Sequence, residues 1–465
     1  MSIQSTYNYN LGLRFYAVAD AFADRTALKF PDGSEVSYAQ LNQVSNQIAR
    51  LLLSRGLKQG YVLAIFNDKS LHGYALILAC LKTGIIYTNL DYNSPWARLD
   101  KIIGTCKPAC ICFDNAGLNF ETEIKNAHAH VPHINIRSTE TLQAITGFSN
   151  ENLVESNSVH GASPAYLMFT SGSTGFPKGA VMSHSNVLYF IQWGKQTFGV
   201  TENDIFTNVN PIYFDNSVFD FYTSTFNGAA LVPISHDIAK DARALVKAIN
   251  DSKCTIWFSV PSLLVYLLTN RALSAADFST VKRISFGGEG FPKNKLKQLY
   301  DLFGDRIKLF NVYGPTECTC ICSSYVISEV DFENMNELAP LGFMAPNFGY
   351  EILPLTAENE NLGELALTGP CVGLGYYNDE ERSKNSFVQN PNKAFHQRMY
   401  KTGDLVERAS NGYLYFKGRV DNQIKHMGYR IELEEVEAAF SSLTYINEVG
   451  VIYQRMSPEL GFIKA

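Results

Sequence analysis

The spacing of apolar residues between residue 11 and about residue 320 switches repeatedly between a helical period and a strand pattern. Helices are predicted over residues 36–55, 70–83, 185–198, 261–268 and 293–303. Buried strands are predicted over residues 61–67, 109–114, 165–170, 254–260, 283–286 and 307–312. Strands that alternate with helices of this length form parallel sheets covered on both faces. The sequence therefore predicts an α/β fold with a large N-terminal lobe of parallel sheets flanked by helices.

The pattern changes between residues 345 and 420, where short apolar runs are separated by Gly, Asn and Pro. These runs predict a small antiparallel β subdomain. A new pattern begins near Asp421, with a helix predicted over 432–440, a strand over 448–453 and a strand-like run over 461–465. A domain that ended in mid-strand would leave hydrogen-bonding groups uncovered. We therefore predict a large domain over residues 1–420 and the start of a truncated α+β lid domain over residues 421–465.

Composition and charge argue against several functional classes. The chain has 465 residues and a formal net charge of −6, and no lysine- or arginine-rich stripe indicates a nucleic-acid partner. The longest apolar run, residues 74–81, is far too short to cross a bilayer. The polar residues 1–10 do not have the pattern of a signal peptide. We therefore expect a cytoplasmic protein without a membrane partner.

Cysteine and histidine form two clusters that a metal ion could use. Cys318, Cys320 and Cys322 alternate, which on a strand places three thiols on one face, and this spacing favours a packed strand over a zinc site. An HxHxxH cluster at residues 128–133 lies in a polar connecting segment. Metal ligation there is an alternative, but a solvated loop is the interpretation that we prefer.

The segment from Tyr166 to His184 carries the strongest chemical signal. A predicted strand leads into a run of hydroxyl side chains and glycines, and a predicted helix follows. Glycine lets the backbone approach a polyanion, hydroxyl and N–H groups donate hydrogen bonds to it, and Lys178 adds a positive charge. The P-loop pattern G-x-x-x-x-G-K-[ST] does not match. These residues predict a phosphate-binding loop, with a flexible Gly/Ser turn as the alternative.

Thr170-Ser-Gly-Ser-Thr-Gly-Phe-Pro-Lys-Gly179 resembles the signature loop of the adenylate-forming superfamily, which includes nonribosomal-peptide adenylation domains, acyl-CoA synthetases and luciferases. Further motifs of this superfamily follow in its order, so the resemblance covers nearly the whole chain. These motifs are Asn311-Val-Tyr-Gly-Pro-Thr-Glu317, Gly363-Glu-Leu-Ala-Leu-Thr-Gly369, Tyr400-Lys-Thr-Gly-Asp404, Gly418-Arg-Val-Asp421 and Gln423-Ile-Lys-His-Met-Gly-Tyr-Arg-Ile-Glu432.

The resemblance implies a site for ATP and Mg²⁺. Tyr313 would stack on the adenine ring, and the Asp404 carboxylate would accept hydrogen bonds from the ribose hydroxyls. Lys178, Thr174 and Glu317 would be catalytic, and Thr174 and Glu317 would also hold the metal ion. The residues implied to contact the nucleotide are Thr170, Ser171, Gly172, Ser173, Gly175, Asn311, Tyr313, Gly314, Thr316, Asp404 and Arg419.

Residues 211–220 resemble the motif that opens the acyl pocket in amino-acid-activating members. Asp215 falls where those members keep a carboxylate for the α-ammonium group of the substrate, although a helix N-cap is an alternative role for it. The implied pocket contains no charged side chain besides Asp215, so we expect a small or medium neutral amino acid. The other residues of this implied pocket are Asn216, Phe219, Phe258, Ser285, Gly287, Val312, Cys320 and Ile321. The segments 286–289 and 424–430 most resemble free-standing D-alanine– or prolyl–carrier-protein ligases.

The implied reaction is the ATP-dependent activation of that amino acid as aminoacyl-AMP, with release of pyrophosphate. The acyl group would then pass to the phosphopantetheine thiol of a carrier protein that acts in trans. Asp421 would be the hinge between the two domains, and Gly428 would line the route of the thiol arm.

Two other functions stay open: an acyl-CoA synthetase that acts on a carboxylic acid, and a non-catalytic lobe that binds a nucleotide or an amino acid. The superfamily places a catalytic lysine near the end of its small domain. Lys464 lacks the expected Gly-Lys context, so we expect this lysine to be absent from the chain and adenylation to be slow.

Overall fold

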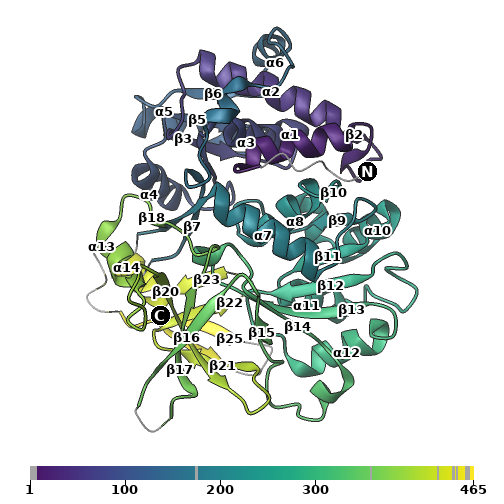
Figure 1. Ribbon diagram of the computed structural model, residues 1–465, viewed down its shortest axis with the longest axis vertical. Coiled ribbons are helices and arrows are strands. Elements are labelled where there is room, and N and C mark those ends of the chain that lie inside the picture. Colours follow the sequence, from purple (N-terminus) through teal and green to yellow (C-terminus); the bar gives the residue numbers. More distant parts are fainter. Residues whose placement is uncertain are drawn as a thin grey trace.

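The computed structural model describes residues 8–172, 176–356, 359–426, 429–441, 443, 446, 449–455 and 461–465. Within these residues, a nine-stranded, a seven-stranded and a five-stranded sheet are accompanied by two two-stranded hairpins. In Figure 1 the chain runs from the purple N-terminal elements at the top to the yellow C-terminal elements at the lower left.

The N-terminal lobe contains the seven-stranded sheet, whose order is β18-β8-β7-β4-β3-β5-β6. The strands from β7 to β6 are parallel, whereas β8 pairs antiparallel with β7 and with β18. Every residue of β3, β4 and β5 is buried, as expected for strands covered on both faces. The strands are β3 (Val62–Phe66), β4 (Ile86–Asn89), β5 (Cys110–Phe113), β6 (His133–Asn135), β7 (Pro164–Thr170), β8 (Lys178–Ser183) and β18 (Gly375–Tyr376).

The helices of the first half of the chain begin at residues that satisfy their free N–H groups. Ser37 and Gln40 form a capping box at the start of α2, and Ser183 and Asn186 form one at the start of α7. The helices are α1 (Leu11–Ala21), α2 (Tyr38–Ser54), α3 (Leu71–Thr83), α4 (Trp96–Cys106), α5 (Glu121–Ala127), α6 (Thr139–Thr146) and α7 (His184–Thr197).

The nine-stranded sheet has the order β15-β14-β13-β12-β11-β9-β10-β1-β2. Its strands from β13 to β1 are parallel, and β2, β14 and β15 add antiparallel edges. The strands are β1 (Thr26–Lys29), β2 (Glu35–Ser37), β9 (Ile205–Asn208), β10 (Ala230–Pro233), β11 (Ile256–Ser259), β12 (Arg283–Gly287), β13 (Lys308–Tyr313), β14 (Ser323–Val326) and β15 (Phe343–Met344). The helices between them are α8 (Asn216–Thr225), α9 (His236–Lys240), α10 (Ala242–Ser252), α11 (Pro261–Thr269) and α12 (Lys293–Phe303).

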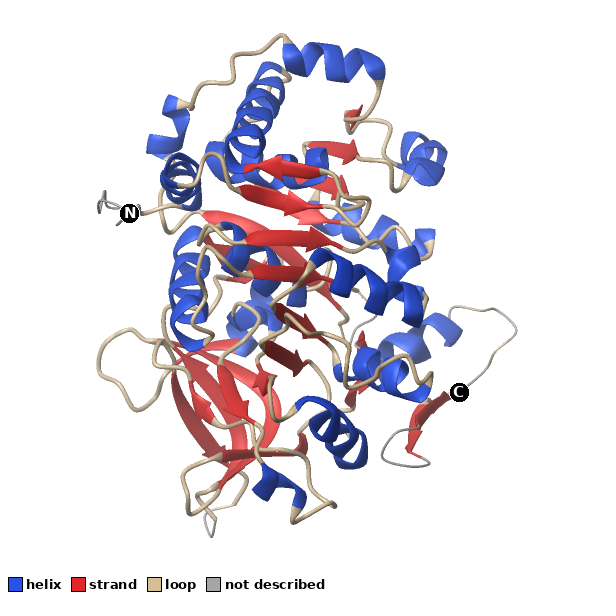
Figure 2. Ribbon diagram, turned by 90° about the vertical axis from the view of Figure 1, so that its right-hand side faces the viewer, coloured by secondary structure: helices blue, strands red, loops and turns tan. Residues whose placement is uncertain are grey.

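The five-stranded sheet is antiparallel and is followed by the short C-terminal elements. Figure 2 separates this sheet, at the lower left, from the C-terminus at the right. Its strands are β16 (Gly349–Pro354), β17 (Leu362–Thr368), β19 (Phe387–Gln389), β20 (Arg398–Arg408) and β21 (Leu414–Arg419), with α13 (Glu380–Ser386) before β19. The elements that follow, which we call the lid segment (residues 421–465), are β22 (Gln423–His426), β23 (Tyr429–Glu432), α14 (Leu433–Ser441), β24 (Ile452–Arg455) and β25 (Gly461–Lys464).

One apolar core joins the three larger sheets, because buried residues such as Leu63, Phe258 and Leu365 belong to the same cluster. The parallel sheets flanked by helices confirm the predicted α/β class, and the antiparallel sheet confirms the predicted β subdomain. In the described part of the chain, no helix is both long enough and apolar enough to cross a bilayer.

Two local predictions are wrong. The glycine-rich loop after Thr170 does not lead directly into a helix: Lys178 begins strand β8, which folds back antiparallel on β7, and the predicted helix follows that strand as α7. The residues from Cys318 to Cys322 do not form a strand. Thr319 and Cys320 have φ angles of 58° and 75°, in the left-handed region, and this turn ends the short 3₁₀ helix before β14 begins.

Candidate active site

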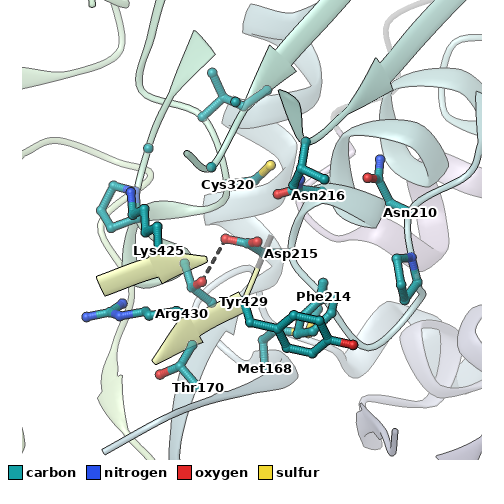
Figure 3. Close-up of a pocket in the computed structure, with 18 of the residues that line it drawn as sticks. Met168, Thr170, Asn210, Phe214, Asp215, Asn216, Cys320, Lys425, Tyr429 and Arg430 are labelled. Atoms are coloured by element: carbon teal, nitrogen blue, oxygen red, sulfur yellow. Dashed lines mark hydrogen bonds between the residues drawn. The ribbon is translucent and has the colours of Figure 1, made fainter. Parts of the chain in front are cut away.

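A cavity of about 400 Å³ lies where the carboxyl ends of β9, β11, β12 and β13 meet strand β7 and the lid segment. In open α/β sheets this edge is where ligands bind. Figure 3 shows Asp215, Asn216 and Cys320 at one side of the cavity, and Lys425, Tyr429 and Arg430 from the lid segment at the other.

Asp215 ends the loop that connects β9 to α8. It occupies the N-cap position of α8, but its side chain makes no capping hydrogen bond. Its Oδ2 instead accepts a hydrogen bond of 2.7 Å from the Thr316 hydroxyl, and burial raises the pKa of its carboxyl above the usual value. A carboxylate held in this way faces the cavity and is available to a cationic ligand.

Most of the residues predicted for the acyl pocket do line the cavity. These are Asp215, Asn216, Phe258, Gly287, Val312, Cys320 and Ile321. Phe219 and Ser285 are not among the lining residues. Both are fully buried: Phe219 packs edge-to-face on Phe258 with ring centroids 5.3 Å apart, and Ser285 pairs with Phe258 in the sheet. They therefore lie behind the wall and support Phe258.

The walls near Asp215 are mostly apolar, but the cavity as a whole is not without charge. The lid segment contributes Lys425 and Arg430, and α4 contributes Arg98. The Phe214 ring, beside Asp215, packs edge-to-face on Tyr429 with centroids 5.2 Å apart.

Two of the predicted nucleotide residues, Asn311 and Tyr313, line a second, smaller hollow together with Gly288. Asp404 and Arg419 line the larger cavity, as Tyr313 also does. The Tyr313 hydroxyl donates a hydrogen bond of 2.6 Å to Asp404 Oδ2, and Arg419 Nη1 lies 2.5 Å from Asp404 Oδ1. Both carboxylate oxygens of Asp404 therefore have partners within the protein. Arg419 also contacts the predicted hinge residue Asp421, at 2.5 and 2.7 Å.

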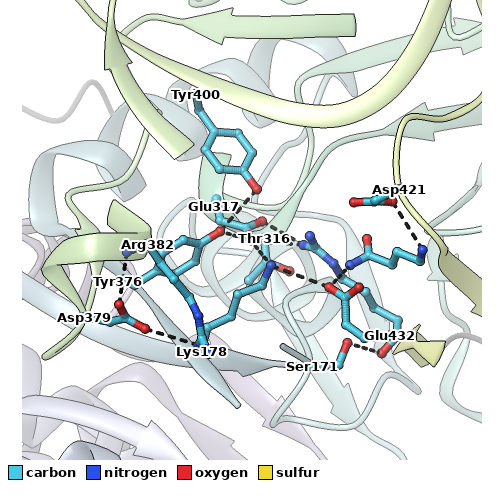
Figure 4. A network of polar contacts seen from close by, with 12 residues as sticks. Ser171, Lys178, Thr316, Glu317, Tyr376, Asp379, Arg382, Tyr400, Asp421 and Glu432 are labelled. Carbon is cyan, nitrogen blue, oxygen red and sulfur yellow. Dashed lines mark hydrogen bonds and ion pairs between the residues drawn. The ribbon is translucent and has the colours of Figure 1, made fainter. Parts of the chain in front are cut away.

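Glu317 is the centre of a buried network of polar side chains (Figure 4). Its carboxylate accepts hydrogen bonds from Arg430 Nη1 at 2.9 and 3.1 Å and from the Tyr376 hydroxyl at 2.8 Å, and Lys178 Nζ lies 3.9 Å away. Burial alone would raise the pKa of Glu317, but the charges of Arg430 and Lys178 outweigh it and hold the pKa at about 2.

For Lys178, burial outweighs the neighbouring carboxylates, and its pKa is lowered. Burial and the nearby Arg430 charge lower its pKa to about 8, although Glu317 and Glu432 act in the other direction. Lys178 Nζ lies 3.8 Å from Glu432 in β23. This lysine is therefore charged at neutral pH and lies between a carboxylate of the large lobe and one of the lid segment.

Strand β23 covers the groups that were predicted to bind phosphate. The Ser171 hydroxyl donates a hydrogen bond of 2.7 Å to the Arg430 carbonyl, and Arg430 pairs with Glu317. Outside this centre, Arg98 of α4 pairs with Glu435 of α14 at 2.8 Å. Contacts with Ser171 and Glu317 at the centre of the site, and with Arg98 outside it, therefore hold the lid segment over the cavity.

Of the other predicted residues, Thr170, Ser171, Gly314 and Thr316 line the cavity. An added Cβ at Gly172 would lie 2.2 Å from the Phe176 carbonyl oxygen, so this loop position requires glycine. Ser173, Thr174, Gly175 and Gly428 lie outside the described residues, and their predicted roles stay predictions.

Sequence reasoning assigned no role to Arg430, Glu432, Lys425, Tyr429 and Tyr376, which the structure places in the site. The first four lie in the motif from Gln423 to Glu432, so the motif itself was a signal that could have found them. Tyr376 lies in no quoted motif, and the spacing of residues gave no signal for it.

The histidine cluster at residues 128–133 does not converge. His128 contacts Asp100 at 2.8 Å, and His133 lies 3.5 Å from Glu121. Among the residues that the structure describes, no group of three or more His, Cys, Asp or Glu side chains is arranged to hold a metal ion.

The chain matches the family described as AMP-binding enzyme over residues 15–377. Bacitracin synthase 1 of Bacillus licheniformis is 32% identical over 431 residues, which are 91% of this chain but only 8% of that protein. An L-proline–[L-prolyl-carrier protein] ligase of Streptomyces coelicolor is 29% identical, over 92% of this chain and 82% of the ligase.

A solved structure of similar fold is the artificially fused adenylation–PCP di-domain NpsA-ThdA from Klebsiella oxytoca. It has a TM-score of 0.83 and 21% sequence identity, and the match covers 98% of this chain and 87% of that one. The family match over most of the chain, together with the motifs gathered around one cavity, shows that this protein belongs to the AMP-binding enzymes of the adenylate-forming superfamily.

Proposed function

We propose that this chain activates a small or medium neutral amino acid with ATP, as aminoacyl-AMP, and transfers it to the phosphopantetheine thiol of a carrier protein in trans. The observation that carries the proposal is Asp215. A carboxylate in a mostly apolar pocket is costly without a cationic partner, and the α-ammonium group of an amino acid would supply one.

The arrangement of the remaining groups supports a reaction at the α-phosphorus of ATP. Tyr313 and Asp404 are hydrogen-bonded to each other and line the cavity, where an adenosine would bind. Thr316 contacts Asp215 and lies next to Glu317. The substrate carboxylate would therefore lie between the ammonium site and the phosphate groups, where positioning and charge neutralisation provide most of the rate enhancement.

The donor chemistry of the site fits a magnesium ion at Glu317 once Arg430 has moved away. Glu317 supplies the buried carboxylate oxygens that Mg²⁺ prefers, but Arg430 neutralises them in this structure. Bound there, the ion would offset the negative charge of the phosphates. Thr174, the second predicted ligand, would complete the site.

We further propose a division at residues 420 and 421, with Asp421 as the hinge of the lid segment. Asp421 lies two residues beyond Arg419, the last residue of β21, and pairs with it. Lys464 is exposed on β25 and does not line the cavity, so we assign it no part in the reaction.

The test is amino-acid-dependent exchange of labelled pyrophosphate into ATP. The panel contains the neutral L-amino acids, which include the L-proline named for the Streptomyces coelicolor ligase, together with glycine, D-alanine and propionate. Asp215→Asn keeps the shape of the side chain and removes its charge, so we expect it to lower exchange with the accepted amino acid roughly 100-fold or more.

Exchange with propionate that equals or exceeds exchange with every amino acid would favour an acyl-CoA synthetase instead. Tight binding of ATP and an amino acid without exchange would favour a binding lobe. Asp204→Asn is the matched control. Asp204 is a buried carboxylate in the same lobe, just before β9, and it does not line the cavity.

A further inference from the structure

Two buried charged side chains have no part in the site described above. Lys69, between β3 and α3, and Asp220, on α8, are 8% and 0% exposed. Charged side chains are almost never buried to this extent without a partner. Lys69 Nζ donates to the backbone carbonyls of Asn208 and Ile234, at 2.6 and 2.8 Å, rather than to a carboxylate.

Asp220 is held by two amides at the end of β9. Its Oδ2 accepts hydrogen bonds from Asn208 Nδ2 at 3.0 Å and from Asn210 Nδ2 at 2.9 Å. Its Oδ1 is buried and has no hydrogen-bond partner. Asn208 in turn accepts a hydrogen bond of 2.6 Å from the Tyr74 hydroxyl. The side-chain hydrogen bonds of Asp220 are therefore all directed at one short stretch of chain.

That stretch begins the loop that carries the ammonium site. Residues 209–215 connect β9 to α8, and Val209, Asn210, Pro211, Phe214 and Asp215 line the cavity. Asn210 Nδ2 donates both to Asp220 and to the Phe258 carbonyl, at 2.9 Å each, and so joins the loop to β11, the neighbouring strand of the sheet. Hydrogen bonds to an ionised acceptor are shorter and stronger than those between neutral groups.

We propose that Asp220 is a positioning residue for substrate binding: its carboxylate fixes the 209–215 loop through Asn208 and Asn210, and so sets the place of Asp215. The proposal rests on the proposed amino-acid site, which it extends to a residue that touches no substrate.

The charge on Asp220 depends on pH near neutrality. Burial raises its pKa to about 7, and the two amides and the Lys69 charge oppose that shift. The other titratable groups packed near it are Tyr74 on α3 and Cys320 in the turn before β14. As pH falls through 7 the carboxyl takes up a proton, and its hydrogen bonds to the loop lose their charge assistance and weaken.

The first measurement needs no substrate. Hydrogen–deuterium exchange of the peptide that covers residues 208–216 is compared in the wild-type protein, Asp220→Asn and the control Asp204→Asn. We expect Asp220→Asn to speed exchange of this peptide roughly tenfold while peptides of β10 and β12 keep wild-type rates. Asp204→Asn should leave residues 208–216 unchanged.

The second measurement uses pyrophosphate exchange with the amino acid that the panel identifies. Asp220→Asn should raise the KM for that amino acid roughly tenfold and leave the KM for ATP unchanged. In the wild-type protein the amino-acid KM should rise as pH falls from 8 to 6, and in Asp220→Asn this dependence should disappear.

A uniform rise in exchange over all peptides, or none at residues 208–216, would overturn the positioning role. If no amino acid supports pyrophosphate exchange, the proposed function fails, and deuterium exchange still decides the role of Asp220. Asn210→Ala breaks the same link without altering a buried charge, so it decides the question if Asp220→Asn does not fold.

Discussion

At the scale of single residues, Gly287 and Val312 decide how closely two strands lie in the cavity wall. A Cβ at Gly287 would lie 2.4 Å from the Val312 carbonyl oxygen and 2.7 Å from its Cγ2. The glycine is therefore needed for the close approach of β12 to β13.

Gly287→Ala should consequently destabilise the protein, because the extra methyl group meets backbone that cannot move aside. We expect a loss of about 1–3 kcal/mol in the free energy of unfolding, measured by urea denaturation. The matched control is Gly104→Ala. Gly104 lies within α4, and an added Cβ there meets nothing within 4 Å. That exchange should stabilise the protein by about 0.5–1 kcal/mol. Equal effects of the two substitutions would contradict our explanation of Gly287.

At the scale of elements, strand β23 competes with any ligand that would bind the Glu317 carboxylate. Arg430 of β23 pairs with Glu317, and the Arg430 backbone accepts the Ser171 hydroxyl. Any ligand that needs Glu317 and Ser171 has to displace this strand, and part of its binding energy is spent in doing so.

Arg430→Met should therefore tighten the binding of Mg²⁺ and ATP about threefold to tenfold, since the strand no longer competes with the metal. Isothermal titration calorimetry with Mg²⁺ and a non-hydrolysable ATP analogue measures this directly. Arg408→Met removes an arginine from the far end of β20, where it bonds to Asn361, and should leave affinity unchanged. Weaker binding in Arg430→Met would show that Arg430 helps the nucleotide instead of excluding it.

The sequence predicts elements well where one pattern dominates. Residues 293–303 are predicted and found as a helix, because apolar residues at helical spacing form a strong stripe within this segment alone. The alternation of Cys318, Cys320 and Cys322 was misleading, since left-handed φ angles at Thr319 and Cys320 depend on tertiary packing. The antiparallel return of β8 was likewise not predictable, because its partner β7 decides whether the residues after the glycine-rich loop extend or coil.

The candidate site was predictable to the extent that it lies in contiguous motifs. Asp215, Tyr313 and Asp404 do come to one region, as their motifs implied. The pairing of Arg430 with Glu317 joins residues 113 positions apart, and spacing along the chain carries no information about such a contact. Phe219 and Ser285 were placed in the wall by position alone, but the structure puts their side chains behind Phe258.

At the scale of the whole molecule, the lid segment is attached through few polar contacts to a lobe that has its own large core. Arg98–Glu435, Lys178–Glu432 and Arg430–Glu317 hold it over the cavity. Such contacts can be exchanged for contacts with ligands at little cost, whereas the apolar core cannot be rearranged.

Addition of Mg²⁺ and ATP should therefore change the distance between α4 and α14. All nine native cysteines are buried. Fluorophores should therefore attach mainly to the introduced thiols of Gly104→Cys and Ser441→Cys, and energy transfer between them measures the distance between α4 and α14. We expect a change in transfer efficiency with Mg²⁺ and ATP that EDTA reverses. Constant efficiency, with nucleotide binding verified in the same sample, would show that the lid segment stays docked.

The left-handed turn at Thr319 and Cys320 restricts how this pocket can evolve. Residues with a side chain pay about 1–2 kcal/mol in that conformation, and Gly, Asn and Asp tolerate it best. Val312 and Ile321 can be exchanged for larger or smaller residues with only packing to consider. Fewer residue types can replace Cys320 than Val312 or Ile321 because of its left-handed backbone, although its side chain also lines the cavity. A lineage that acquires a new substrate is therefore expected to change positions 312 and 321 first and position 320 last.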